Sequence, residues 1–193
     1  MNNKVRTALF GGSFDPIHNG HTALARAVLE YGLADEVWLL VTPQNPHKQG
    51  RNLTDENDRL KMAQYALNGE KGMQASDFEF SLPRPSYTIN TLNALEAAYP
   101  DREFLLLMGA DNWQKIDKWY KADEIQSRFG IIVYPRDGEE VPQLPDNVRW
   151  LQSPLYDISS TEIRNAIAQG SSIDEWLHPS VLSYIKEKGL YRQ

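Results

Sequence analysis

The stretch that most constrains the fold runs from Phe10 to His21, between an apolar segment and a predicted helix. Residues 5–10 have the short apolar pattern of a strand, and residues 22–31 have the pattern of a helix. Two glycines and a proline between them favour a sharp turn of the backbone. The sequence therefore predicts a strand, a turn and a helix in succession, which is the repeating unit of α/β folds.

The residue types in this turn suit an anionic ligand. Gly11 and Gly12 let a ligand come close to the backbone, because neither carries a Cβ. His18 and His21 flank the expected start of the helix, where a helix N-terminus already favours negative charge. We therefore predict a phosphate site that carries two titratable donors.

The turn differs from the two commoner phosphate-binding loops. A dinucleotide-binding turn has the pattern Gly-x-Gly-x-x-Gly, whereas Ser13 stands here in place of the second spaced glycine. The sequences Gly-Lys-Ser and Gly-Lys-Thr, which mark a P-loop, occur nowhere in the chain. The turn therefore belongs to neither class.

Six segments with strand patterns alternate with predicted helices along the chain. The strand segments are residues 5–10, 36–41, 77–82, 103–108, 130–134 and 148–151. Residues 103–108 are the most apolar of them, which predicts a central strand. The alternation predicts an α/β fold, a Rossmann-like, doubly wound and mostly parallel sheet with helices on both faces.

Length and composition limit the class of protein. The 193 residues suit one compact domain spanning 1–193. The net charge of −6 argues against a nucleic-acid partner, so an anionic ligand needs a local positive site. Without cysteine, disulfides and thiolate metal sites are excluded. Neither a signal peptide nor a membrane span is recognisable, so we expect a cytoplasmic protein without a membrane partner, and a homodimer stays open.

Two predicted helices carry clear end signals. Thr54 is expected to cap a helix that runs to about Leu67, with acidic residues in its first turn. A C-terminal helix is expected to begin at Pro179 and to end at Gly189.

Three further stretches bring polar or aromatic side chains to positions beyond predicted strands, where open α/β sheets bind ligands. His47 and Lys48 follow the second strand and could serve phosphates. Asp111 follows residues 103–108 and can bond a hydroxyl, although it fits a helix cap equally well. Trp119 and Tyr120 lie just beyond, where aromatic residues form either core or a stacking wall for a flat ring.

The C-terminal helical part, about residues 159–193, begins with a second candidate anion site. Ser159 and Glu162 fit a capping box, so a helix starts here with its first amide groups exposed. The added donors are the side chains of Ser160, Thr161 and Arg164. A capping box alone is structural, but together with the first turn it predicts a second nucleotide-binding motif.

These motifs resemble those of the bacterial nicotinate-nucleotide adenylyltransferases, members of the nucleotidyltransferase superfamily with a His-x-Gly-His motif. The matching segments are GGSFDPIHNGH at 11–21, PHK at 46–48, PSYT at 85–88, GAD at 109–111, WY at 119–120 and ISSTEIR at 158–164. They follow the family's order over nearly the whole chain. The first and last are shared with related nucleotidyltransferases, and the middle ones select the nicotinate enzyme.

The resemblance implies adenylyl transfer from ATP to nicotinate mononucleotide, giving deamido-NAD and pyrophosphate in NAD biosynthesis. The residues it implies for ATP are Gly11, Gly12, Ser13, Phe14, His18, His21, Asp111, Ser160, Thr161 and Arg164. Those it implies for nicotinate mononucleotide are Asp15, His47, Lys48, Tyr87, Thr88, Ile89, Trp119 and Tyr120. The implied catalytic groups are those of His18, His21, Lys48 and Arg164. Mg²⁺ would travel with ATP and pyrophosphate, without metal ligands from the protein.

This reaction needs no protein nucleophile, because the 5′-phosphate of the mononucleotide can attack the α-phosphorus of ATP directly. Catalysis then consists of positioning and charge stabilisation. Two alternatives stay open at this point. One is another small-molecule nucleotidyltransferase, acting on nicotinamide mononucleotide or phosphopantetheine, and the other is a non-catalytic nucleotide sensor with the same fold.

Overall fold

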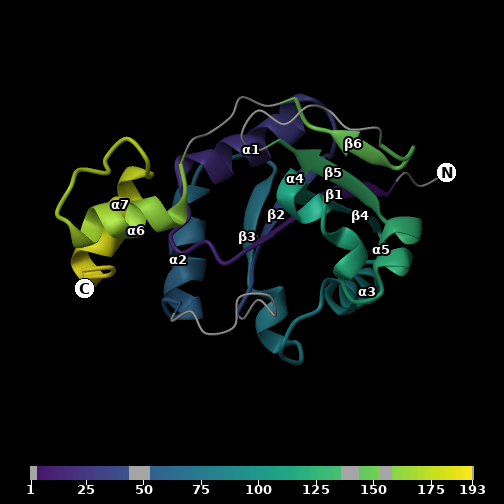
Figure 1. The fold of residues 1–193 in the computed structure, drawn as a ribbon, viewed down its shortest axis with the longest axis horizontal. Coiled ribbons are helices and arrows are strands. Elements are labelled where there is room, and N and C mark those ends of the chain that lie inside the picture. Colours follow the sequence, from purple (N-terminus) through teal and green to yellow (C-terminus); the bar gives the residue numbers. More distant parts are fainter. Residues whose placement is uncertain (1–3, 44–52, 136–143, 153–157, 193) are drawn as a thin grey trace.

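The fold is built around one parallel sheet. The structure is a computed structural model that describes residues 4–43, 53–135, 144–152 and 158–192. The strands of the described residues are β1 (Val5–Gly12), β2 (Glu36–Val41), β3 (Met73–Ser76), β4 (Arg102–Gly109), β5 (Gly130–Tyr134) and β6 (Val148–Trp150). They lie in the order β3-β2-β1-β4-β5-β6, and every pairing among them is parallel. This confirms the predicted α/β sheet, with β1 and β4 at its centre (Figure 1).

The helices connect these strands. The α-helices of the described residues are α1 (Asn19–Glu30), α2 (Glu56–Ala66), α3 (Thr88–Ala98), α4 (Ala110–Trp113), α5 (Ala122–Arg128), α6 (Ser160–Ala168) and α7 (Pro179–Lys188). Two short 3₁₀ helices are η2 (Phe78–Ser81) and η3 (Ile116–Lys118). The predicted ends of α7 are confirmed, since Pro179 is its first residue and Gly189 ends it in the left-handed region at φ 64°. The capping box between Ser159 and Glu162 is also present at the start of α6.

Helices cover both faces of the sheet because successive strand residues point to opposite sides. On β2, Val37, Leu39 and Val41 enter one hydrophobic core, while Trp38 and Leu40 enter the other. The first core takes its α-helical residues from α1, α2, α6 and α7, and the second takes them from α3, α4 and α5. In Figure 1, α6 and α7 accordingly lie beside α2, and α3 lies beside α5 at the other end.

The prediction of a strand over residues 77–82 is wrong. The strand is β3, at Met73–Ser76, and its pairing with β2 ends where Ser76 lies beside Leu40. The chain then turns into η2, in which the Phe80 amide donates to the Asp77 carbonyl at 2.8 Å. Phe78 and Phe80 alternate as strand residues would, but they do so because they pack against different cores.

Two predicted helix starts also differ from the structure. Asp55, not Thr54, caps α2, since its carboxylate accepts a 2.8 Å hydrogen bond from the Asn57 amide. Thr54 instead offers its carbonyl to Arg59. Helix α1 begins at Asn19, three residues before the predicted start, so His18 is its N-cap and His21 lies in its first turn.

Candidate active site

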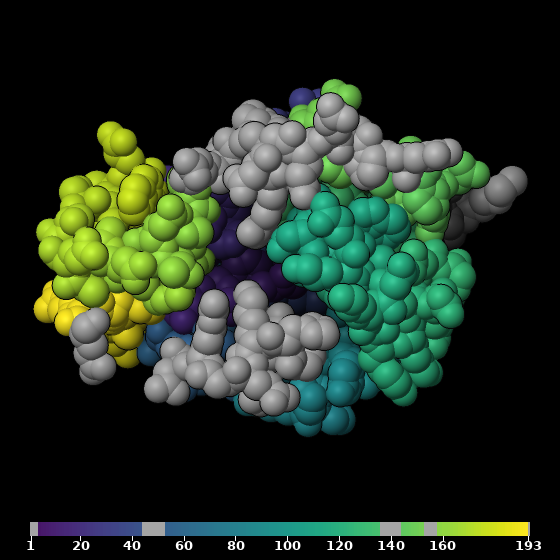
Figure 2. Space-filling model, viewed as in Figure 1, coloured from purple at the N-terminus to yellow at the C-terminus, as the bar shows by residue number. Residues whose placement is uncertain are grey.

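A cavity of about 1210 Å³ opens at the carboxyl ends of β1 and β4. Its walls include the turn after β1 and the first residues of α3, α4 and α6. The strands β1 and β4 are neighbours whose following helices pack on opposite faces, which is the arrangement that forms a ligand crevice in open α/β sheets. In Figure 2 the N-terminal segment, in purple, is visible at the bottom of a hollow between the C-terminal helices and the teal segment.

The turn after β1 has an unusual backbone, which Phe14 fixes. Phe14 has φ 47°, a left-handed conformation that costs a non-glycine residue about 1–3 kcal/mol. Its ring is buried against Phe10 and His21, at centroid distances of 5.6 and 5.1 Å. A Cβ on Gly12 would come within 3.0 Å of the Phe14 ring, whereas one on Gly11 would meet nothing within 4 Å. Glycine is therefore needed at position 12 for packing, and at position 11 the backbone stays open to a ligand.

The two histidines are stacked on one another at the start of α1. Their ring centroids lie 3.7 Å apart, and the His18 amide donates to Nδ1 of His21 at 3.2 Å. Because Nδ1 accepts a hydrogen bond, neutral His21 carries its proton on Nε2. In this tautomer the Nε2 side of His21 can act as a hydrogen-bond donor.

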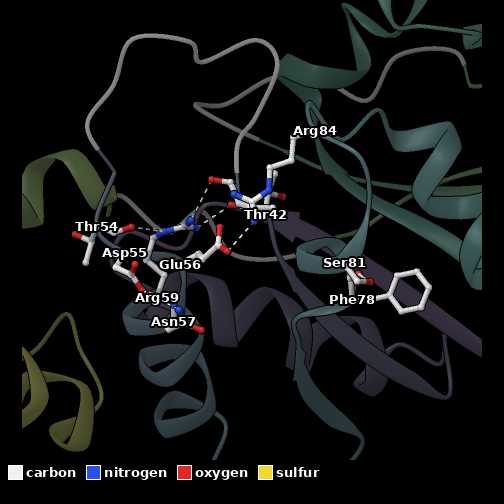
Figure 3. Close-up of polar contacts among 10 residues, drawn as sticks. Thr42, Thr54, Asp55, Glu56, Asn57, Arg59, Phe78, Ser81 and Arg84 are labelled. Atoms are coloured by element: carbon white, nitrogen blue, oxygen red, sulfur yellow. Dashed lines mark hydrogen bonds and ion pairs between the residues drawn. The ribbon is translucent and has the colours of Figure 1, made fainter.

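Arg59 holds the turn from behind, and the sequence analysis missed it. Its side chain is 1% exposed and donates to the carbonyls of Thr42 at 2.8 Å and Thr54 at 2.9 Å (Figure 3). It also donates to the Ser13 carbonyl at 2.6 Å. Burial lowers the pKa of Arg59, and the nearby Asp15 carboxylate counteracts this change. Arginine remains charged, so a buried cation lies directly behind the turn.

The second predicted anion motif lies against the first. The Ser160 hydroxyl donates to the Pro16 carbonyl at 2.9 Å. The Arg164 guanidinium donates to the Asp15 carbonyl at 2.7 Å and to the Thr161 hydroxyl at 3.2 Å. Two motifs almost 150 residues apart in sequence therefore form one polar wall.

Aromatic side chains form the opposite wall. The Tyr87 and Tyr120 rings lie 5.0 Å apart and are 38% and 52% exposed, and Trp119 lines the cavity beside them. Tyr87 precedes α3 and makes no side-chain bond to its first amides. The wall therefore combines exposed flat rings with a helix N-terminus that favours an anion.

A buried acid, Glu79, lines the cavity between these walls. Thr91 donates to its Oε1 at 2.8 Å, and no described residue bonds to its Oε2. Burial raises the pKa of Glu79, and the hydroxyls of Thr91 and Thr42 partly counteract the rise. Glu79 was not predicted from the sequence, because residues 77–82 have the pattern of a strand.

Most predicted site residues lie together. Those that line the cavity are Gly11, Gly12, Ser13, Phe14, His18, His21, Tyr87, Thr88, Asp111, Trp119, Tyr120, Ser160, Thr161 and Arg164. His47 and Lys48 lie outside the described residues. Ile89 is buried in the second core, and the Asp15 carboxylate accepts a 2.5 Å hydrogen bond from Tyr191 instead of facing the cavity. In the described ranges no three His, Asp or Glu side chains converge as a metal site would require.

Known proteins share this sequence and architecture. A family model described as "Cytidylyltransferase-like" matches residues 9–166. A "Probable nicotinate-nucleotide adenylyltransferase" of Bacteroides fragilis is 50% identical over 94% of this chain and 92% of its own length. The protein of that name from Bacteroides thetaiotaomicron is 45% identical over 96% of this chain and 93% of its own.

A solved structure supports the fold. The Plasmodium falciparum nicotinic acid mononucleotide adenylyltransferase complexed with NaAD superposes with a TM-score of 0.82. The match covers 97% of each chain, at 20% identity, and so concerns the architecture alone. The two bacterial relatives match over nearly their whole length, and the family model covers most of the chain. The chain therefore belongs to the cytidylyltransferase-like family and, within it, to the nicotinate-nucleotide adenylyltransferases.

Proposed function

We propose that this protein transfers the adenylyl group of ATP to nicotinate mononucleotide, forming deamido-NAD and pyrophosphate in NAD biosynthesis. The observation that carries the proposal is a single cavity that joins a two-histidine phosphate turn, the N-terminus of α6 and an exposed aromatic wall. A nucleoside triphosphate needs hydrogen-bond donors for its phosphates, and an anion with a flat ring needs an aromatic surface. A site that binds both must combine the two kinds of wall. The curated relatives carry the name of this activity.

In the proposed reaction, a 5′-phosphate oxygen of the mononucleotide attacks the α-phosphorus of ATP. The bond from that phosphorus to the bridging oxygen breaks, and pyrophosphate leaves with the electron pair. The open backbone at Gly11, the His21 Nε2 proton and the Arg164 guanidinium are the donors assigned to the transferring phosphoryl group. Their effect is electrostatic, and they need little rearrangement because the turn is already fixed.

The two substrates are assigned to opposite walls. ATP is assigned to the turn and α6, where the N-terminal amides and Arg164 face its phosphates. Nicotinate mononucleotide is assigned to the aromatic wall, with its ring on Trp119 and its carboxylate at the amides of Tyr120 and of Thr88–Ile89 in the first turn of α3. His47 and Lys48 stay assigned to the mononucleotide phosphate on the sequence resemblance alone.

Mg²⁺ belongs to the proposal as part of the MgATP substrate, since ATP phosphates bind it without a dedicated protein cage. We also assign residues 1–193 to one nucleotidyltransferase domain, because α6 and α7 contribute Ile163 and Val181 to the first core. None of the helices in the described ranges has the length and apolar character needed to cross a membrane. A cytoplasmic location and a homodimer remain predictions from the sequence.

The test is turnover with competing acceptors. Purified protein with MgATP is given nicotinate mononucleotide, nicotinamide mononucleotide or phosphopantetheine in parallel, and pyrophosphate release is followed. We expect a strong preference for the nicotinate form. Faster turnover of either other acceptor contradicts the substrate assignment, and no turnover with any of them favours the nucleotide sensor.

A further inference from the structure

The phosphate turn is held by a residue at the far end of the chain. The Tyr191 hydroxyl donates a 2.5 Å hydrogen bond to Oδ1 of Asp15, 176 positions earlier in the sequence. Asp15 is 2% exposed, so this bond to a carboxylate is shielded from water and stronger than one between neutral groups. On the other carboxylate oxygen, Oδ2, the Thr54 amide approaches at 3.4 Å.

Asp15 lies at the centre of the turn that carries the phosphate-binding groups. It follows the left-handed Phe14, and its own carbonyl accepts the 2.7 Å hydrogen bond from Arg164. His18, three residues later, is the N-cap of α1. A shift of Asp15 would therefore move Arg164 and the two histidines together.

The backbone at Tyr191 and the segment before α7 are both held in place, so the Tyr191 hydroxyl has a defined position. Tyr191 has φ 63°, a left-handed conformation that non-glycine residues rarely adopt, and it packs against the first core. The segment before α7 is also joined to the turn, because the Asn19 amide donates to the Trp176 carbonyl and its side chain to the Glu175 carbonyl, both at 2.9 Å.

We propose that Tyr191 is a positioning residue for adenylyl transfer, whose hydroxyl orients Asp15 and through it the turn that presents His18, His21 and Arg164. The inference rests on the proposed function. Tyr191 does not line the cavity, so its effect is on the geometry of the donors. Misplacement of such groups by about 1 Å can lower a rate about a hundredfold.

The same part of the chain supplies a matched control. Tyr184, on α7, donates a 2.6 Å hydrogen bond to Oδ1 of Asp58 on α2. This is also a tyrosine–aspartate bond that fastens the C-terminal helices to the rest of the molecule, but Asp58 is not part of the turn and neither residue lines the cavity. A purely structural role of the C-terminal residues would make the two bonds equivalent.

The experiment compares Tyr191→Phe with Tyr184→Phe in steady-state kinetics with MgATP and nicotinate mononucleotide, and in thermal unfolding. For Tyr191→Phe we expect kcat to fall about tenfold or more while both KM values change less than about threefold, which is the signature of a lost transition-state arrangement. Tyr184→Phe is expected to lower Tm without changing kcat. A kcat of Tyr191→Phe within about twofold of wild type, or equal losses of kcat in both variants, would overturn the proposal.

Two additional measurements sharpen the test. If Tyr191 acts through Asp15, the double variant Asp15→Asn/Tyr191→Phe should have a kcat less than about twofold below that of Asp15→Asn alone. A kcat lowered by the product of the two single losses would contradict the coupling. The imidazole NMR signals of His18 and His21 should shift in Tyr191→Phe and stay in place in Tyr184→Phe. If the wild-type protein shows no turnover, the proposed function is refuted, but the role of Tyr191 in placing the turn is not. The imidazole NMR signals of His18 and His21 then decide whether Tyr191 places the turn.

Discussion

The two walls of the cavity are built in opposite ways. The phosphate wall consists of the turn after β1 and the start of α6. Ser160 and Arg164 of α6 donate to the carbonyls of Pro16 and Asp15, and the Tyr191 hydroxyl donates to the Asp15 carboxylate. Arg59 donates to the Ser13 carbonyl. On the aromatic wall, Tyr87 and Tyr120 are 38% and 52% exposed, and the start of α3 has no side-chain cap. One wall is held by partly buried hydrogen bonds, and the other presents exposed rings without such bonds.

This difference fits the two tasks of an adenylyl transfer site. Charge stabilisation requires donors that do not reorganise during the reaction, and buried hydrogen bonds provide that rigidity. Selection of a flat ring depends on contact area and on one or two polar groups, which exposed loops can supply. Changes on the phosphate wall should therefore lower kcat, and changes on the aromatic wall should raise KM for one substrate.

The largest effect is expected for His21→Ala. The change removes the Nε2 donor and the acceptor for the His18 amide, so kcat should fall about 10²–10³-fold while the fold is retained. His178→Ala is the control, because His178 caps α7 and lies off the cavity. It should lower the free energy of unfolding by about 1 kcal/mol without changing kcat. Activity of His21→Ala within threefold of wild type would show that His21 is not a catalytic donor.

Arg59→Met should be next, and it should lower both stability and kcat. Its loss leaves the partly buried carbonyls of Ser13, Thr42 and Thr54 without this donor, at a cost of up to about 1–3 kcal/mol for each group left unsatisfied. Arg84→Met, in the same view of Figure 3, breaks only a 2.7 Å ion pair of a 44% exposed side chain with Glu56. That control should change stability by less than about 1 kcal/mol in urea unfolding. Equal destabilisation of the two variants would contradict a buried anchor at Arg59.

Local signals in the sequence predicted most of the fold, and long-range contacts account for what it did not predict. The bounds of β2 and β5 and the ends of α7 agree with the predictions, since they depend on neighbouring residues. The strand predicted at 77–82 failed because pairing with β2, which lies far away in sequence, determines where β3 ends. The sequence motifs predicted many of the residues that line the cavity. Arg59 and Tyr191, in contrast, contact residues that lie 46 and 176 positions away in the sequence, and no local pattern contains such contacts.

On the aromatic wall, Trp119→Ala should raise KM for nicotinate mononucleotide about 10–100-fold, since stacking on a base is worth about 1–3 kcal/mol. KM for ATP and kcat should change little, because Trp119 is assigned to the nicotinate ring and not to ATP. Trp113→Ala is the control, as Trp113 also packs against the second core but does not line the cavity. A parallel rise in KM for ATP, or a similar result in the Trp113 variant, would show that Trp119 is only a core residue.

The smallest effect is expected from Glu79→Gln, and it concerns how stability depends on pH. Burial raises the pKa of Glu79 in the folded protein, so the folded state favours the protonated acid. The stabilisation from protonated Glu79 is fully present below the pKa of a glutamate in the unfolded chain, about 4.3. It is lost as the pH rises through the pKa of Glu79 in the folded protein. Glutamine stays neutral, so Tm of Glu79→Gln relative to wild type should rise between pH 4 and pH 8.

Thermal unfolding across that pH range measures the difference, with each unit of pKa change equal to about 1.4 kcal/mol. Glu103→Gln, at an exposed position on β4, is the matched control for the loss of one carboxylate. A constant offset of Glu79→Gln from wild type would mean that Glu79 keeps its charge as easily in the cavity as in water. The region between the two walls would then be solvated, and the contrast between a fixed and an adjustable wall would rest on the anchors of the turn alone.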